Sequence, residues 1–181
     1  MAEMANLKIA VGMEVPGEGL VGLITYMRTD SVNVAGSARA AAAKLIEREY
    51  GKAYLPDAPN AFKSKKGAQE AHEAIRPTDP GRTPESLRST LKPDQFKLYD
   101  LIWRRFMSSQ MAPARYQVTT AELVCGGAAF EASGRVTLFD GYTRIYGRDG
   151  GDQQLPALAV GAELTSSQVA ATQHFTSPPR R

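Results

Sequence analysis

Two residues near the start of the chain, Tyr26 and Arg28, could together attack and stabilise a phosphate. Side chains two positions apart in a strand share a face, so the phenol and the guanidinium would lie together. A phenol with a pKa of about 10 loses about 4 kcal/mol of driving force if it must react as a phenolate near neutral pH. A cation about 4 Å away, at an effective dielectric of about 20, recovers about 4 kcal/mol, and the guanidinium fork also fits a phosphate. A half-buried strand tyrosine beside an exposed arginine would show the same spacing.

The stretch that holds this pair, residues 22–31, predicts a strand that ends at a surface. Leu23 and Ile24 are apolar and favour β structure, and mostly polar residues follow them as far as Ser31. Asp30 belongs to this polar group. The alternation of a strand would point Thr25, Met27 and Thr29 away from the tyrosine.

A second polar cluster lies in residues 68–78, around His72 and Arg76. On a helix these two side chains are one turn apart, which would suit contact with a phosphate or a base. A surface turn in which Arg76 pairs with Glu73 explains the same spacing. The His-Glu pair does not make a zinc-protease helix, because Arg76 stands where the second histidine is required.

A loop predicted over residues 52–68 contains two prolines and then Lys63, Lys65 and Lys66. Three lysines within four positions would attract a strand of phosphates. An ordinary solvated loop has the same composition.

Composition restricts the remaining possibilities. The chain has 181 residues, 43% hydrophobic and 23% charged, as is usual for a folded protein. The single Cys125 rules out an internal disulfide, and the two histidines, His72 and His174, are too few for a Cys/His metal site. The net charge of +3 arises in residues 1–112, which carry 16 Lys+Arg against 13 Asp+Glu. We find no signal peptide and no long apolar run, and therefore expect a soluble, intracellular protein without a membrane partner.

The elements predicted around these residues are helical first and β-rich afterwards. A short helix is expected over residues 1–12, a loop over 15–19, a helix start at Thr83, and an end to the helical part near 111–113. A helix ending near Tyr50 should bury Ala38, Ala42, Leu45 and Ile46. The longest helix starts at Pro93 and should bury Phe96, Leu98, Leu101, Ile102, Phe106 and Met107.

Residues beyond 113 favour strands. Strands are expected over 116–124 and 128–138, joined by a turn at Gly126-Gly127, with the β-rich part continuing through 142–146 and a last strand over 163–173. The fold class is therefore α+β: a mainly helical tyrosine-bearing domain, residues 1–112, and an antiparallel β-rich domain, residues 113–181.

Three motifs resemble the central region of the bacterial DNA topoisomerase I family, whose members are type IA enzymes. They are Leu23-Ile-Thr-Tyr-Met-Arg-Thr-Asp-Ser31, Ala71-His-Glu-Ala-Ile-Arg-Pro-Thr78 and Leu101-Ile-Trp-Arg-Arg-Phe-Met-Ser-Ser-Gln-Met-Ala-Pro113. The first two, in this order and some forty residues apart, are the specific ones. Met27 favours topoisomerase I over the topoisomerase III branch, and reverse gyrase shares part of the region.

The resemblance implies an isomerase that cleaves and rejoins single-stranded DNA and relaxes negative supercoils. Tyr26 would be the nucleophile and would form a 5′-phosphotyrosine intermediate, with Arg28 stabilising the scissile phosphate. It also implies that His72 and Arg76 contact DNA, with Asp30 as a polar neighbour. The β-rich part would belong to the arch that hinges the DNA gate, and the protein would act in the bacterial cytoplasm at the nucleoid.

The family's acidic domain, with its Asp-x-Asp-x-Asp cluster, precedes this region and is not found in the sequence. The resemblance therefore implies that Mg²⁺ binds outside this chain, in a metal-binding domain of the same polypeptide, and that the chain alone is inactive. Residues 32–36 also lack the Ser or Asp cap usual before the next helix. The alternative function is a noncatalytic module that binds single-stranded DNA.

Overall fold

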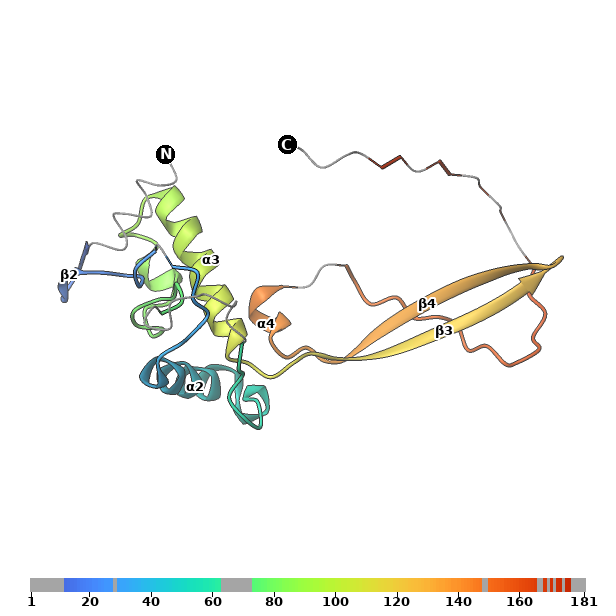
Figure 1. Cartoon of the computed structure of the whole chain (residues 1–181), viewed down its shortest axis with the longest axis horizontal. Coiled ribbons are helices and arrows are strands. Elements are labelled where there is room, and N and C mark those ends of the chain that lie inside the picture. Colours follow the sequence, from blue (N-terminus) through green and yellow to red (C-terminus); the bar gives the residue numbers. More distant parts are fainter. Residues whose placement is uncertain are drawn as a thin grey trace.

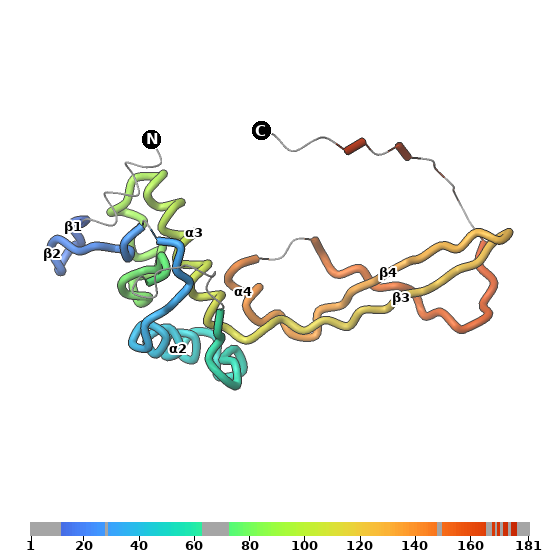
Figure 2. The backbone as a smooth tube through the Cα atoms, in the orientation of Figure 1, coloured from blue at the N-terminus to red at the C-terminus, as the bar shows by residue number. Residues whose placement is uncertain are grey.

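The computed structural model describes residues 12–27, 29–62, 73–147 and 150–165, together with residues 168, 170, 172, 173, 175 and 176. They form a helical body and a long two-stranded arm that extends from it (Figure 1). The two long helices precede the antiparallel strands of the arm (Figure 2), so the predicted α+β class is confirmed. The helix predicted over residues 1–12 lies, apart from Gly12, outside the described residues.

The described chain begins with a small antiparallel hairpin, β1 (Met13–Val15) and β2 (Gly19–Val21). The loop predicted from Pro16 and its glycine neighbours is the turn of this hairpin. Its two short strands were not predicted, because three residues are too few to show a period.

Helix α2 (Gly36–Tyr50) buries the four residues that its sequence predicts, Ala38, Ala42, Leu45 and Ile46. Its N-cap residue is Ala35, which offers no side-chain cap, in agreement with the missing Ser or Asp. The helix ends at Gly51, and a short 3-10 turn, η1 (Lys52–Tyr54), follows.

Helix α3 (Pro93–Ser109) is rotated relative to the prediction. It buries Phe106 and Met107 as expected, but Leu101 is 57% exposed, and the centre of the buried face is Tyr99 and Trp103. The prediction of a buried Leu101 is wrong because both aromatic residues find acceptors for their polar tips inside the body. The Tyr99 hydroxyl donates to the carbonyl of Arg82 (2.7 Å) and the Trp103 indole N–H to that of Pro80 (2.8 Å).

The segment that receives these bonds contains the 3-10 turn η2 (Glu85–Leu87). The helix start predicted at Thr83 is this three-residue turn, whose N-cap is Pro84; the Thr83 hydroxyl accepts the Ser86 N–H at 3.3 Å. Leu87 and Leu91 add to the core, which Leu23 and Ile24 join from the tyrosine segment. None of the helices that the structure describes is long and apolar enough to cross a membrane.

The arm is the antiparallel pair β3 (Arg115–Cys125) and β4 (Ala128–Phe139). The predicted turn is confirmed: Gly126 and Gly127 join the strands with φ of +56° and +85°, and a two-residue turn of this hand requires positive φ at both positions. Most of the arm is solvent-exposed, including its large apolar side chains Val118, Val124, Phe130 and Leu138.

One further segment lies along the outer edge of β4 near its root. Arg135 and Gln153 exchange backbone hydrogen bonds of 2.7 and 3.0 Å, and Thr137 binds the Asp152 carboxylate.

Residues 143–146, expected in the β-rich part, form the helical turn α4 (Thr143–Tyr146). The last strand, predicted over 163–173, is not formed by any of the residues described in that range.

The arm joins the body through a compact set of hydrogen bonds. The Ala112 N–H donates to the Tyr54 carbonyl (2.8 Å), and the Tyr142 N–H donates to the Ala112 carbonyl (2.9 Å). The Tyr54 hydroxyl donates to the Asp140 carboxylate (2.6 Å), and this bond, with burial, raises the pKa of Tyr54. Gly141, at φ +48°, passes so close that a Cβ there would lie 2.6 Å from the Ala112 carbonyl oxygen. The change from helix to strand near residue 113 is as predicted.

Candidate active site

Tyr26 stands at the end of a short extended segment whose preceding residues are buried. Leu23 and Ile24 are 0% and 3% exposed, whereas Tyr26 is 64% exposed. It is the most exposed of the seven tyrosines of the chain, all of which the structure describes. The exposed phenol agrees with the prediction, but the predicted strand does not form: among the described residues of 22–31 only Ile24 makes a β-bridge, and Thr25 and Met27 lie in bends.

The segment before Tyr26 pairs with residues 74–78. Ile24 and Pro77 form an antiparallel bridge, with backbone bonds from Thr25 N–H to the Arg76 carbonyl (2.9 Å) and from Thr78 N–H to the Leu23 carbonyl (3.0 Å). Two hydroxyls strengthen the pairing. That of Thr25 donates to the Ala74 carbonyl (2.7 Å) and accepts the Arg76 N–H (3.0 Å). That of Thr78 donates to the Gly22 carbonyl (2.6 Å). The backbone is thus fixed as far as the residue next to Tyr26.

Arg76 and Glu73 hold the other strand of this pair in place. The Arg76 guanidinium is buried and binds both Glu73 oxygens, at 2.8 and 2.9 Å, and also the Pro77 carbonyl, at 2.8 Å. Glu73 in turn accepts the N–H of Ala35 (2.8 Å), where α2 begins. Partial burial raises the pKa of Glu73, but the bonds from Arg76 and Ala35 and the charge of Arg76 outweigh it, so the pKa lies below its usual value.

The ion pair between Arg76 and Glu73 is therefore present, as the second interpretation of this motif expected. Residues 73–78 are extended rather than helical, so the helical placement of Arg76 is wrong. The reason is the pairing with residues 22–25, which uses the backbone groups that a helix would need. Contact between Arg76 and DNA stays a prediction.

The other predicted site residues are less fully placed. Asp30 is exposed, and residues 29–33 are held by local bonds such as Ser31 N–H to the Thr29 hydroxyl (3.0 Å). The remaining predicted site residues lie outside the described residues: Arg28, His72, Lys63, Lys65 and Lys66. Their roles stay predictions.

Within the described part of the chain, no three His, Cys, Asp or Glu side chains gather as a metal site would require. Glu73, the carboxylate joined to the Tyr26 segment, is occupied by Arg76 and the Ala35 N–H. These residues do not fit a magnesium ion, and binding of Mg²⁺ elsewhere in a longer polypeptide stays a prediction.

Comparison with known proteins gives consistent matches. A family model described as DNA topoisomerase matches residues 18–181. DNA topoisomerase 1 of Haemophilus influenzae is 47% identical over 163 residues, covering 88% of this chain and 19% of that protein. The Campylobacter jejuni enzyme of the same name is 46% identical over 165 residues, covering 91% and 24%.

The chain belongs to the type IA DNA topoisomerase family. The solved structure of full-length topoisomerase I from Thermotoga maritima shares its fold, with a TM-score of 0.73 and 34% identity over 86% of this chain and 25% of that one. This topoisomerase chain therefore spans about a fifth to a quarter of the length of these relatives.

Sequence reasoning about the topoisomerase motifs missed two structural roles. Thr25 was read only as a residue facing away from Tyr26, although its hydroxyl bridges the two paired segments. Glu73 was considered only as a partner for Arg76, although it also binds the start of α2. The signal for the first was present, because a hydroxyl that directly follows a buried apolar segment needs a hydrogen-bond partner.

Proposed function

We propose that this chain carries the nucleophile of a type IA DNA topoisomerase and that Tyr26 is that nucleophile. The supporting observation is the position of Tyr26: an exposed phenol directly after a hydrogen-bonded, buried segment. Other tyrosines are less suited to attack. Burial raises the pKa of Tyr99, and the Tyr54 hydroxyl is bound to Asp140.

In the proposed reaction, the Tyr26 oxygen attacks a backbone phosphorus of single-stranded DNA. A phosphotyrosine ester forms to the 5′-phosphate, the bond to O3′ breaks, and the proton lost by the phenol is balanced by the one gained by the 3′-hydroxyl. After another strand passes through the break, this hydroxyl attacks the ester and restores Tyr26. One phosphodiester replaces another at each step, so no nucleotide hydrolysis is required.

The fixed backbone before Tyr26 supports this role. A nucleophile must lie in line with its leaving group, and misplacement by about 1 Å can cost about a hundredfold in rate. The bonds of Thr25 and Thr78 restrict the position from which Tyr26 extends. In the proposal Arg28 stabilises charge on the phosphate, and His72, Arg76, Asp30 and the three lysines of residues 63–66 contact the DNA.

The decisive experiment supplies the acidic metal-binding domain of a relative as a second polypeptide. With magnesium and a single-stranded oligonucleotide labelled at its 3′ end, we expect the label to become covalently attached to the 181-residue chain. Tyr26→Phe should abolish the adduct, and Tyr50→Phe, a matched change at the end of α2, should retain it. Labelling that persists in Tyr26→Phe, or no labelling of the unmodified chain in a mixture shown to be active with a complete relative, would overturn the proposal.

We further propose that the chain alone does not relax supercoiled DNA. The described residues contain no metal site, and the family resemblance places the acidic cluster elsewhere. A gel assay with magnesium and high protein should therefore show unchanged supercoiled DNA. Relaxation that disappears in Tyr26→Phe would contradict this expectation.

A further inference from the structure

Both ends of the loop that carries Tyr26 are bonded to one short segment, residues 73–76. The loop comprises residues 25–35, and the structure describes every position of it but one. At its start, Thr25 and Arg76 are joined twice. The Thr25 N–H donates to the Arg76 carbonyl (2.9 Å), and the Arg76 N–H donates to the Thr25 hydroxyl (3.0 Å). Tyr26 directly follows this first attachment.

The far end of the loop returns to the same segment. The Ala74 N–H donates to the Asn33 carbonyl (2.8 Å), and the Ala35 N–H donates to the Glu73 carboxylate (2.8 Å). Ala35 is the N-cap residue of α2 and has no side-chain cap of its own, so the Glu73 carboxylate lies at the positive end of the helix dipole. Because this bond uses a side chain, a substitution can remove it without changing the backbone.

Arg76 joins the two attachments. Its guanidinium holds both Glu73 oxygens, at 2.8 and 2.9 Å, while its backbone holds Thr25. The side chain of Arg76 is only 10% exposed and that of Glu73 32%, so solvent screens this pair less than it screens a surface pair. A continuous path of contacts therefore runs from Thr25 through Arg76 and Glu73 to Ala35, and it closes the loop around Tyr26.

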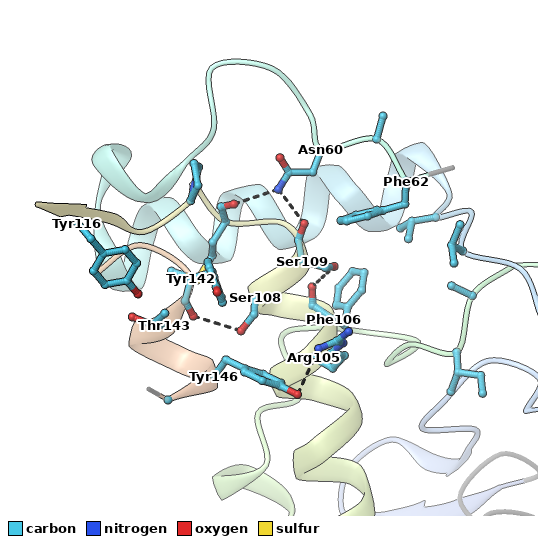
Figure 3. Close-up of a pocket in the computed structure, with 18 of the residues that line it drawn as sticks. Asn60, Phe62, Arg105, Phe106, Ser108, Ser109, Tyr116, Tyr142, Thr143 and Tyr146 are labelled. Atoms are coloured by element: carbon cyan, nitrogen blue, oxygen red, sulfur yellow. Dashed lines mark hydrogen bonds between the residues drawn. The ribbon is translucent and has the colours of Figure 1, made fainter. Parts of the chain in front are cut away.

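Between its two ends the loop has little other support. Its described internal side-chain hydrogen bonds, such as that from the Asn33 N–H to the Ser31 hydroxyl (3.1 Å), span only two residues. Val32 and Val34 line a pocket of about 800 Å³ between the end of α3, the loop at residues 60–62 and α4, which Figure 3 shows. On that side the loop borders open space, so the attachments at its ends contribute more to its position than packing does.

We propose that Glu73 is a positioning residue for the Tyr26 nucleophile, because its carboxylate closes the loop that carries the phenol. This role rests on the proposed function of Tyr26. Glu73 has the same sign of charge as a phosphate and would repel DNA, so it acts on the reaction through Arg76 and Ala35 and not by contact with the substrate. Loss of the carboxylate releases the far end of the loop, and a small displacement of a nucleophile from its in-line position slows attack strongly.

The first test measures the rate of adduct formation in the mixture of this chain with the metal-binding domain of a relative, at increasing concentrations of the 3′-labelled oligonucleotide. Glu73→Ala should lower the maximal rate about tenfold to a hundredfold, while the DNA concentration that gives half of this rate stays within about twofold. Glu73→Gln keeps an oxygen for the Ala35 N–H and should lower the maximal rate less. It also provides a second variant if Glu73→Ala does not fold.

The matched controls are Glu85→Ala and Glu85→Gln. Glu85 binds Arg88, three residues further on, through two bonds of 2.8 and 2.9 Å, the same spacing and distances as in the pair of Glu73 with Arg76. No hydrogen bond joins Glu85 to a described residue of the loop. These controls should leave the maximal rate unchanged. Thermal unfolding of each variant verifies that the rates are compared at a temperature where all the proteins are folded.

A second measurement does not depend on cleavage. In protein labelled with 3-fluorotyrosine, the fluorine resonance of Tyr26 is the one that disappears in Tyr26→Phe. Glu73→Ala should shift or broaden this resonance and leave unchanged that of Tyr99, which is fully buried in the core. Glu85→Ala should change neither resonance. A general loss of structure would affect both tyrosines, so this result separates positioning from stability.

An unchanged maximal rate in folded Glu73→Ala would overturn the proposal, as would an equal loss in Glu85→Ala or a loss that saturating DNA restores. The outcome is separable from that of the proposed function. A Tyr26-dependent adduct that forms equally fast in all variants removes the positioning role alone. If the unmodified chain forms no adduct, the nucleophile is removed, and the fluorine resonance decides whether Glu73 places Tyr26: a change confined to the Glu73 variants supports this, and no change overturns it.

Discussion

The helical body and the β3–β4 arm are stabilised in different ways, the body by buried side chains and the arm by backbone hydrogen bonds. In the body, α3 and the tyrosine segment bury complete side chains such as Tyr99, Leu23 and Met107. In the arm, both faces of the hairpin are largely exposed, and its order comes from a continuous ladder between the strands. An isolated two-stranded hairpin is marginally stable in water. The body can therefore fix a reactive group in place, whereas the arm depends on its root.

The largest expected effect tests this contrast in the core. Trp103→Ala removes a buried ring and leaves the Pro80 carbonyl without its donor, so we expect a loss of about 3–5 kcal/mol in the free energy of unfolding. Phe130→Ala on the arm should cost less than about 1 kcal/mol, because that ring is already half exposed. Urea unfolding followed by tryptophan-independent circular dichroism measures both. Similar losses would show that the arm is packed as tightly as the body.

The joint between the two regions is the next most sensitive point. Gly141→Ala places a Cβ 2.6 Å from the Ala112 carbonyl oxygen at a φ of +48°, and should cost about 2–4 kcal/mol. Gly126→Ala is the control, since it has a similar φ of +56° and nothing within 4 Å, and should cost only about 1 kcal/mol. Equal destabilisation of the two variants would mean that close packing at the joint is unimportant.

A smaller effect, dependent on pH, is expected where the body holds the tyrosine segment. Glu73→Gln should cost about 1–2 kcal/mol at neutral pH, since the bonds with Arg76 and Ala35 lose their charge assistance. The folded-state pKa of Glu73 lies below its unfolded value, so its contribution is present above the unfolded value and is lost as pH falls through the folded one.

The Glu73→Gln variant should therefore lose less stability than the unmodified chain between about pH 5 and pH 3, the range around the ordinary pKa of a glutamate. Chemical denaturation at several pH values measures this difference. Glu85→Gln is the control, because Glu85 pairs with Arg88 while both side chains are more than 60% exposed. A parallel decline in all three proteins would contradict the assigned role of Glu73.

The smallest predicted change concerns a single hydrogen bond at the joint between the body and the arm. Tyr54→Phe removes the hydroxyl that binds Asp140, and should cost about 0.5–1.5 kcal/mol. Hydrogen exchange should show faster opening of amides at the root of β4, with little change in α2. Uniform acceleration in both regions would show that the bond stabilises the whole chain rather than the joint.

Local patterns in the sequence predicted a large part of this structure. Helix α2 and its buried alanines, the turn at Gly126-Gly127 and the two arm strands follow from periodicity and turn chemistry. The buried face of α3 did not, because the positions of Tyr99 and Trp103 depend on carbonyls at residues 80 and 82, which no local period encodes. The exposed Leu101 is the other consequence of the same rotation.

In the candidate site, too, some features were predictable from local sequence and others depend on contacts between distant segments. The exposure of Tyr26 was predictable from the change within residues 22–31 from apolar Leu23 and Ile24 to mostly polar residues. The extended form of residues 73–78 was not, since it arises from pairing with a segment about fifty residues earlier. The side chains around the pocket between the end of α3, the loop at residues 60–62 and α4 come from separate parts of the chain, and only the fold brings them together.

The length of the arm determines how far its tip moves when the angle at its root changes. Strands of 11 and 12 residues extend about 40 Å at roughly 3.4 Å per residue. A rotation of about 10° at Gly141 would therefore carry the Gly126-Gly127 tip through about 7 Å, a displacement that follows from this strand length alone. The hydrogen bonds among Ala112, Tyr142, Tyr54 and Asp140 therefore set the direction of the arm. A small change in angle at this point produces a large displacement of the tip.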